Sequence, residues 1–221
     1  GVPAGINAFA LGARLTNPRA RIQLRWSCVE EDPLGALAAE GVELISNRDI
    51  PTPDRTREPW GVCALRPDGA LHSLASPYWH WGNVYVKLVR NILGGGWDVL
   101  SREDGRAVNY WWGMASGAVG VLMDPELPEG VRQLADILQQ GVAGGFILPF
   151  HRPIRGQDGT VHNDGERWFS PEEILRMDWL CDCVDGDIPP FEALLPMARS
   201  IVRLQGVYRE DIPPEKEGTI L

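Results

Sequence analysis

The sequence predicts an α/β fold, in which the strands of a parallel sheet alternate with helices. Two kinds of segment alternate along the chain: short apolar or alternating runs typical of strands, and longer runs with apolar residues every three or four positions, typical of helices. Of the 221 residues, 44% are hydrophobic, which is enough for a sizeable core. The 25 glycines and 18 prolines favour many turns over a helical bundle.

The first predicted element is an amphipathic helix. Ile6, Phe9, Ala10 and Ala13 recur at helical spacing, and the helix ends at residues 17–18, Asn-Pro. Strands follow wherever apolar residues alternate or form short runs. The predicted strands cover residues 22–26, 42–45, 60–65, 71–76, 107–112 and 118–123.

Further helices are predicted between and after these strands. A short helix covers residues 34–39, and longer apolar stripes at 84–92 and 131–142 each end at consecutive glycines. Ser170, Pro171 and Glu173 form a strong helix start, from which we expect a helix to about Cys183.

Two further segments complete the predicted organisation. Asp158-Gly159 predicts a turn between two short strands. Residues 207–221 are polar and contain prolines, so we expect a C-terminal tail. One domain is therefore expected over residues 1–206.

The charge balance argues against several classes of partner. There are 30 Asp and Glu against 21 Lys and Arg, a net charge of −9, whereas binders of nucleic acids or anionic membranes need a basic surface. The sequence contains neither an apolar run long enough for a membrane span nor a signal-peptide pattern. Because the chain begins with Gly1 and leads directly into a helix, we expect a fragment of a longer protein.

The four cysteines do not form a metal-binding pattern. Cys181 and Cys183 are a C-x-C pair without a second pair at zinc-site spacing, and the four histidines do not cluster with them. We interpret all four cysteines as buried or half-exposed thiols and predict no cofactor and no metal.

No catalytic constellation is evident either. Glu30, Glu31 and Asp32 follow a predicted strand. They could carry out acid–base chemistry there or belong to a solvated loop, and the sequence leaves both interpretations open. The glycines at 94–96 precede no lysine, so they match neither a P-loop nor a dinucleotide fingerprint. The sequence therefore favours a protein that is not an enzyme.

Tryptophan is unusually frequent, with nine in the chain, and its positions are informative about function. Trp79 and Trp81 flank His80, and Trp111 is followed by Trp112, near the ends of predicted elements. Such rings suit stacking on a planar ligand, although packing within the core is an open alternative. Arg48 and Asp49 lie just past a strand, where they would contact such a ligand or form a surface ion pair.

Five motifs, in order, carry a resemblance to a known family. They are Gly5 to Arg14 followed by Asn17-Pro18, Trp26 with Asp32-Pro33, Ser76 to Gly82 before a Tyr-containing helix, Asn109 to Met114 with Gly117, and Pro149-Phe150 followed by Gln157 to Gly159. From about residue 5 to 185 the chain resembles the basic-membrane-protein family, the purine-nucleoside receptors that serve ABC importers.

The resemblance implies a type I periplasmic-binding-protein fold with two lobes and a ligand between them. This chain would be mostly the second lobe, with residues 76–106 returning to a first lobe that lies upstream. The implied ligand is a purine nucleoside or a similar planar molecule, and the implied partners are the missing lobe and an ABC permease. The family is usually extracytoplasmic and attached to the plasma membrane, while the branch resembled here favours a cytoplasmic sensor.

The expected ligand-binding residues combine aromatic and polar side chains. They are Trp26, Glu30, Arg48, Asp49, Trp79, Trp81 and Trp111. Glu30 and Glu31 stand where many relatives carry aromatic residues. Two alternatives are a nucleoside-processing enzyme with Glu30, Glu31 or Asp49 as acid or base, and a degenerate module that mediates oligomerisation.

Overall fold

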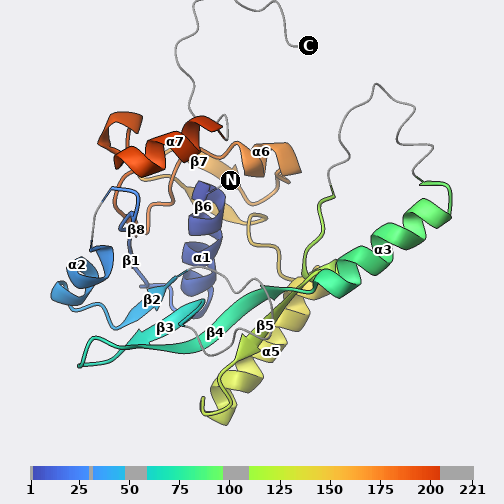
Figure 1. Cartoon of the computed structure of the whole chain (residues 1–221), viewed down its shortest axis with the longest axis horizontal. Coiled ribbons are helices and arrows are strands. Elements are labelled where there is room, and N and C mark those ends of the chain that lie inside the picture. The colour runs from blue at the N-terminus through green and yellow to red at the C-terminus, as the bar shows by residue number, and fades with distance from the viewer. Residues whose placement is uncertain (1, 30–31, 48–58, 97–109, 205–221) are drawn as a thin grey trace, which may run out of the picture. The chain divides into compact units, whose positions relative to one another are not determined.

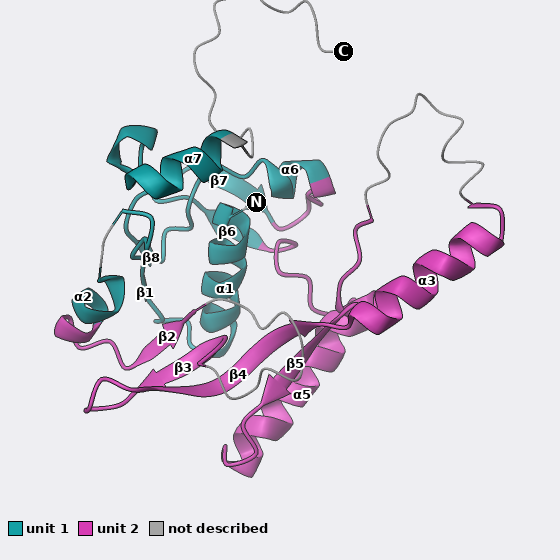
Figure 2. Ribbon diagram, in the orientation of Figure 1, with its two compact units in different colours: residues 1–37, 153–164, 172–221 teal, residues 38–152, 165–171 magenta. Residues whose placement is uncertain are grey.

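The computed structural model describes residues 2–29, 32–47, 59–96 and 110–204. The chain divides into two compact units, shown in different colours in Figure 2. Unit 1 comprises residues 1–37, 153–164 and 172–221, and unit 2 comprises residues 38–152 and 165–171. The predicted tail at 207–221 and part of the predicted return segment, 97–106, lie outside the described residues.

Unit 1 is built around the first helix. Its described helices are α1 (Val2–Thr16), α2 (Pro33–Ala39, whose last two residues are assigned to unit 2), α6 (Pro171–Leu175, whose first residue is assigned to unit 2) and α7 (Pro196–Leu204), with a 3-10 turn at Phe191–Ala193. Its strands are the parallel pair β1 (Ile22–Gln23) and β8 (Val184–Asp185) and the hairpin β6 (Pro153–Arg155) with β7 (Val161–Asp164).

The core of unit 1 forms on one side of α1. Ala4, Asn7 and Leu11, at helical spacing, are buried. The side-chain amide of Asn7 has three partners. Its Nδ2 donates to the carbonyl of Trp179 at 2.9 Å and approaches Sδ of Met177 at 3.1 Å. Its Oδ1 accepts a hydrogen bond from the backbone N–H of Cys181 at 2.8 Å. This buried amide therefore ties residues 177–181 to α1.

The predicted free thiols are confirmed. All four cysteines are free, with Cys63, Cys181 and Cys183 buried and Cys28 half-buried. Burial raises the pKa of the Cys181 thiol to about 12, and burial likewise raises the pKa of Cys183. Both groups are therefore inert thiols at neutral pH.

Unit 2 contains a four-stranded sheet in the order β2-β3-β4-β5, with antiparallel neighbours throughout. The strands are β2 (Leu44–Ser46), β3 (Val62–Leu65), β4 (Leu71–Trp79) and β5 (Val119–Met123). The described residues of this unit include the helices α3 (Trp81–Leu93) and α5 (Glu129–Ala143), with a 3-10 turn at Met114–Ser116. Figure 1 shows α3 following β4 and extending away from the sheet.

The prediction of a parallel sheet is wrong for these four strands. β3 and β4 are joined by a tight turn in which the N–H of Arg66 donates to the carbonyl of Ala70 at 2.9 Å. A connection this short permits only an antiparallel pair, because a parallel pair needs a crossover of a dozen or more residues. Among the described residues, parallel pairing is found between β1 and β8. The mixed arrangement of helices and strands is compatible with an α/β binding-protein fold.

The predicted element bounds hold best where local signals are strong. The helices at 34–39, 84–92 and 131–142 are confirmed, the first as α2 (Pro33–Ala39), and the turn at Asp158-Gly159 joins β6 to β7.

Three predicted elements need correction. The strand at 22–26 is only two residues long, and residues 110–112 of the predicted strand 107–112 are not extended into a sheet, whereas 107–109 lie outside the described residues. The helix expected from 170 to 183 ends at Leu175, because the backbone at 179–181 is drawn into hydrogen bonds with Asn7.

Candidate functional site

The end of β4 and the start of α3 carry a series of aromatic rings. Trp79 and Trp81 stack with ring centroids 5.6 Å apart and planes 23° from parallel. Tyr85, one helical turn further, stacks on Trp81 at 6.1 Å and 29°. We call Trp79, Trp81 and Tyr85 the aromatic ladder. The three residues are 39%, 42% and 59% exposed, so the ladder is partly accessible to solvent.

Backbone and side-chain bonds hold the ladder in place. The N–H of His80 donates to the carbonyl of Ala118 at 2.8 Å, and Nδ2 of Asn83 donates to the carbonyl of Gly117 at 3.1 Å. The ammonium of Lys87 donates to the carbonyl of Ser116. The first two turns of α3 are therefore fixed to the segment that precedes β5.

Trp111 lies on the chain just before this same segment. Its neighbour Tyr110 accepts a hydrogen bond from Asn91 of α3 at 3.2 Å and packs on Trp112, with centroids 4.5 Å apart. The segment from Tyr110 to Ser116 thus contacts α3 at both its last and its first turns. Trp111 itself is 57% exposed.

The structure does not test the other predicted ligand-binding residues as part of the ladder. Trp26 belongs to unit 1, where its indole N–H donates to the carbonyl of Asp187 at 2.8 Å. Glu30, Arg48 and Asp49 lie outside the described residues, as does Glu31. Asp32 accepts a hydrogen bond from the N–H of Gly35 at 2.9 Å, which is the bond of a helix cap, and this geometry gives it a structural role at α2.

Tyr85 was missed as a ladder residue by reasoning from the sequence. The available signal was its spacing, four residues after Trp81 in a helical pattern, which places the two rings on the same side of the helix. The stripe at 84–92 was used only to predict the helix.

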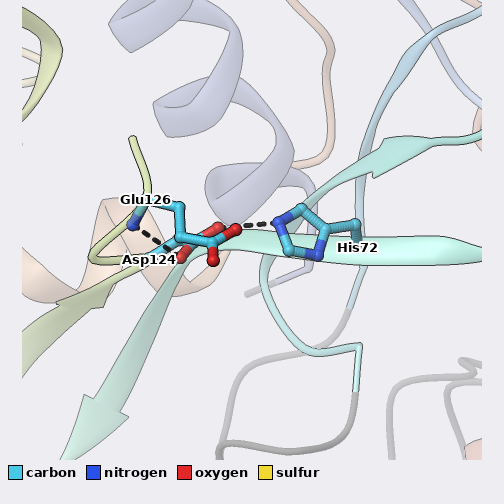
Figure 3. A group of neighbouring side chains, drawn as sticks. All are labelled: His72, Asp124 and Glu126. Atoms are coloured by element: carbon cyan, nitrogen blue, oxygen red, sulfur yellow. Dashed lines mark hydrogen bonds and ion pairs between the residues drawn. The ribbon is translucent and has the colours of Figure 1, made fainter. Parts of the chain in front are cut away.

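A second group that sequence reasoning missed lies at the edge of the sheet. Nε2 of His72 lies 2.7 Å from Oδ2 of Asp124, and Oδ1 of Asp124 accepts the backbone N–H of Glu126 at 3.0 Å (Figure 3). The hydrogen bond from Glu126, followed by that from His72, lowers the pKa of Asp124. No sequence signal links residues 52 positions apart, because only the pairing of β4 with β5 brings them together.

A shallow groove of about 460 Å³ lies beside this group, between β5 and α5. Its lining includes Val121 and Met123 on the strand side and Glu129, Arg132 and Asp136 on the helix side. The groove is open and mixes both signs of charge, so it does not resemble an enclosed apolar ligand pocket.

Two helices of unit 2 expose their apolar sides. None of the residues of α3 or of α5, all of which the structure describes, is buried. Val89 and Ile92 on α3 are 51% and 43% exposed, and Leu134 and Ile137 on α5 are 49% and 63% exposed. Among the described residues, no helix is both long and apolar enough to cross a membrane.

Comparisons with known proteins point to ligand binding. No family model matches the chain. A purine-binding protein of Brucella abortus is 28% identical over 204 residues, which cover 85% of this chain and 55% of that protein. A Haloferax volcanii protein, provisionally named as the ABC transporter glucose-binding protein TsgA13, is 31% identical over 129 residues, or 52% of this chain and 31% of that protein.

Both relatives are named as binding proteins rather than enzymes, which is compatible with a chain that is not an enzyme. The chain spans about half the length of the first relative and about a third of the second. These similarities support a ligand-binding role: the match over 85% of the chain is to a protein named for purine binding, and the match over 52% is to one named for an ABC transporter.

Proposed function

We propose that this chain is the larger part of the ligand-binding region of a solute-binding protein of the basic-membrane-protein type, and that it binds a purine nucleoside or a similar planar molecule. The observation that carries the proposal is the partly exposed aromatic ladder, since near-parallel rings that solvent can reach suit stacking on a flat heterocycle. The similarity to a protein named for purine binding supports the same ligand class.

In this proposal aromatic residues form the walls of the ligand site, and polar residues orient the ligand. Trp79, Trp81 and Trp111 stack against or enclose the base, Glu30, Arg48 and Asp49 contact its polar atoms, and Trp26 is a further ligand-binding residue. The ligand shifts the population from an open to a closed form through its greater affinity for the closed one.

The missing first lobe completes the site. Residues 76–106 contain α3, whose apolar side is exposed, and a helix with such a side needs an apolar partner. We propose that the segment returns to a first lobe of the same protein, as one lobe of a type I binding fold. An ABC permease or a sensor pathway receives the loaded protein.

The test is a titration of this chain with adenine, adenosine, guanosine and D-glucose, followed by thermal shift and by tryptophan fluorescence. We expect stabilisation by the purines, by about 2.7 kcal/mol when the ligand is at a hundredfold excess over its dissociation constant. Trp79→Ala is expected to weaken binding about tenfold, because removing one stacking face costs about 1–3 kcal/mol.

The matched control is Trp168→Ala. Trp168 is also an exposed tryptophan of unit 2, but it stacks on His151 outside the ladder, so its loss should leave purine affinity unchanged. If the wild type and Trp79→Ala bind purines with equal affinity, Trp79 does not stack on the ligand.

Other outcomes identify the alternatives. Stabilisation by glucose alone moves the ligand class to sugars, the class in the name of the Haloferax relative. Turnover of a nucleoside to base and sugar shows an enzyme, with Glu30, Glu31 or Asp49 as the acid or base. A stable dimer that responds to no ligand shows an oligomerisation module.

A further inference from the structure

We propose that His72, Asp124 and Glu126 form a binding site for a divalent transition-metal ion of the Zn²⁺ class at the β4–β5 edge of unit 2. We call these three residues the edge triad. One nitrogen or oxygen atom from each side chain lies within 4.8 Å of the others, so a single ion can reach all three. The triad is separate from the aromatic ladder and does not depend on the proposed purine site.

The fold brings the three side chains together from two strands and a turn. Ala75 pairs with Met123, and the N–H of Asp124 donates to the carbonyl of Leu74 at 2.8 Å, which sets Asp124 beside β4. His72 lies two residues before Leu74 on β4, and its Nε2 lies 2.7 Å from Oδ2 of Asp124. The turn after β5, closed by a bond from the N–H of Leu127 to the carbonyl of Asp124, returns Glu126 to the group.

The donor set selects the class of ion. One imidazole and two carboxylates suit Zn²⁺ and its first-row neighbours, whereas Mg²⁺ and Ca²⁺ prefer oxygen ligands alone. In a tetrahedral zinc site with bonds of about 2.0–2.2 Å, ligand atoms lie roughly 3.3–3.5 Å apart. The 2.7 Å between His72 and Asp124 therefore has to open by less than about 1 Å, and the ion takes the place of the shared proton.

Hydrogen bonds fix the carboxylate of Asp124, the central ligand of the proposed site. Oδ1 of Asp124 is held by the N–H of Glu126, and Oδ2 faces His72, as Figure 3 shows. The side chain of Asp124 is 11% exposed and that of His72 is 35% exposed, so the site is accessible from solvent through His72 and Glu126. Three protein ligands leave a fourth position for water.

One neighbouring charge opposes the ion. Arg66, at the turn between β3 and β4, acts electrostatically on the Asp124 carboxylate. Its positive charge repels a cation at the triad, so we expect an affinity in the micromolar range. Replacing it should tighten binding, which gives the site a signature that nonspecific binding to surface carboxylates lacks.

The test is calorimetric titration of the whole chain with ZnCl₂, with MgCl₂ as the comparison and Co²⁺ absorption as a report on geometry. We expect one Zn²⁺ per chain, no heat with Mg²⁺, and the intense visible bands of tetrahedral Co²⁺. His72→Gln, which retains an amide that can bond Asp124, is expected to weaken Zn²⁺ binding at least tenfold, as is Glu126→Gln. Arg66→Gln should strengthen it severalfold.

His151→Ala is the matched control, because His151 is another partly exposed histidine of unit 2 and stacks on Trp168 away from the triad. It should leave Zn²⁺ binding unchanged. The proposal is overturned if the wild type takes up no Zn²⁺ at 100-fold excess over chain, or if His72→Gln and Glu126→Gln bind as the wild type does. Binding lost only in His151→Ala would likewise overturn it.

Discussion

Helices α1 and α3 have similar lengths, and α3 is the more strongly amphipathic of the two, yet it is α1 that buries residues. α1, in unit 1, buries four of its 15 residues, whereas α3, in unit 2, buries none of its 13. α5 also buries none. The comparison teaches that the apolar stripe of a helix predicts the helix but does not say whether its partner is present in the chain.

The two units also differ in how their polar groups are used. In unit 1 a buried amide, Asn7, is saturated with partners from residues 177–181, so the core closes on itself. In unit 2 the polar bonds of α3 connect its first turns to the segment before β5 and leave its apolar side open. Stability is therefore expected to concentrate in the core of unit 1 and in the sheet of unit 2.

The largest expected effect is that of Asn7→Ala. The change removes the acceptor of the buried N–H of Cys181 and the donor to the part-buried carbonyl of Trp179, which costs about 1–3 kcal/mol for each hydrogen bond. We expect a loss of about 4 kcal/mol of unfolding free energy, measured by urea denaturation. Asn83→Ala is the control, because the exposed Asn83 makes one bond, and its loss should cost less than about 1 kcal/mol. Equal effects of the two variants would contradict a core centred on Asn7.

Gly61→Ala tests whether the sheet of unit 2 is packed as tightly as the core of unit 1. Gly61 has a φ of 69°, and a Cβ there would lie 2.6 Å from Cα of Ser76. The left-handed backbone and the clash together should cost about 3 kcal/mol.

Gly69→Ala is the matched control for the sheet. Gly69 has a φ of 82° but an added Cβ meets nothing within 4 Å, so only the backbone cost of about 1–2 kcal/mol applies. Thermal unfolding of both variants separates the cost of the left-handed backbone from the cost of the steric clash. A Gly61→Ala variant no less stable than Gly69→Ala would show that β3 and β4 are loosely packed.

The smallest effect, and the most direct comparison, comes from one substitution made in each unit. Val184 in unit 1 is 2% exposed and Val89 on α3 is 51% exposed. Val184→Ala should cost about 2 kcal/mol through lost burial and a cavity, whereas Val89→Ala should change the unfolding free energy by less than about 0.5 kcal/mol. If Val89→Ala is as costly as Val184→Ala, α3 is already covered in solution, and a self-association measurement would then identify a second copy as the cover.

Several elements could be predicted because their signals are local. The stripe from Val84 to Ile92 and the glycines after it set α3, and Asp158-Gly159 set the β6–β7 turn, since both depend on residues within a few positions of one another. The stacking tryptophans were found for the same reason, because Trp79 and Trp81 are two residues apart.

Other features could not be predicted because they depend on distant residues. The helix after Ser170 has a strong start, but it ends at Leu175 because the Asn7 side chain forms hydrogen bonds with the backbone at 179–181. The edge triad joins His72 to residues more than 50 positions away, which no spacing pattern indicates.

The sequence by itself determined the positions of most helices, the turns, the free thiols and the aromatic ring cluster, because propensity, capping and periodicity act over a single turn or strand. Only the tertiary structure decided that the main sheet is antiparallel, that Asn7 belongs to the core and that His72 meets Asp124. Those outcomes arise from strand pairing and from the burial of polar groups, and both depend on which distant backbone satisfies which hydrogen bond.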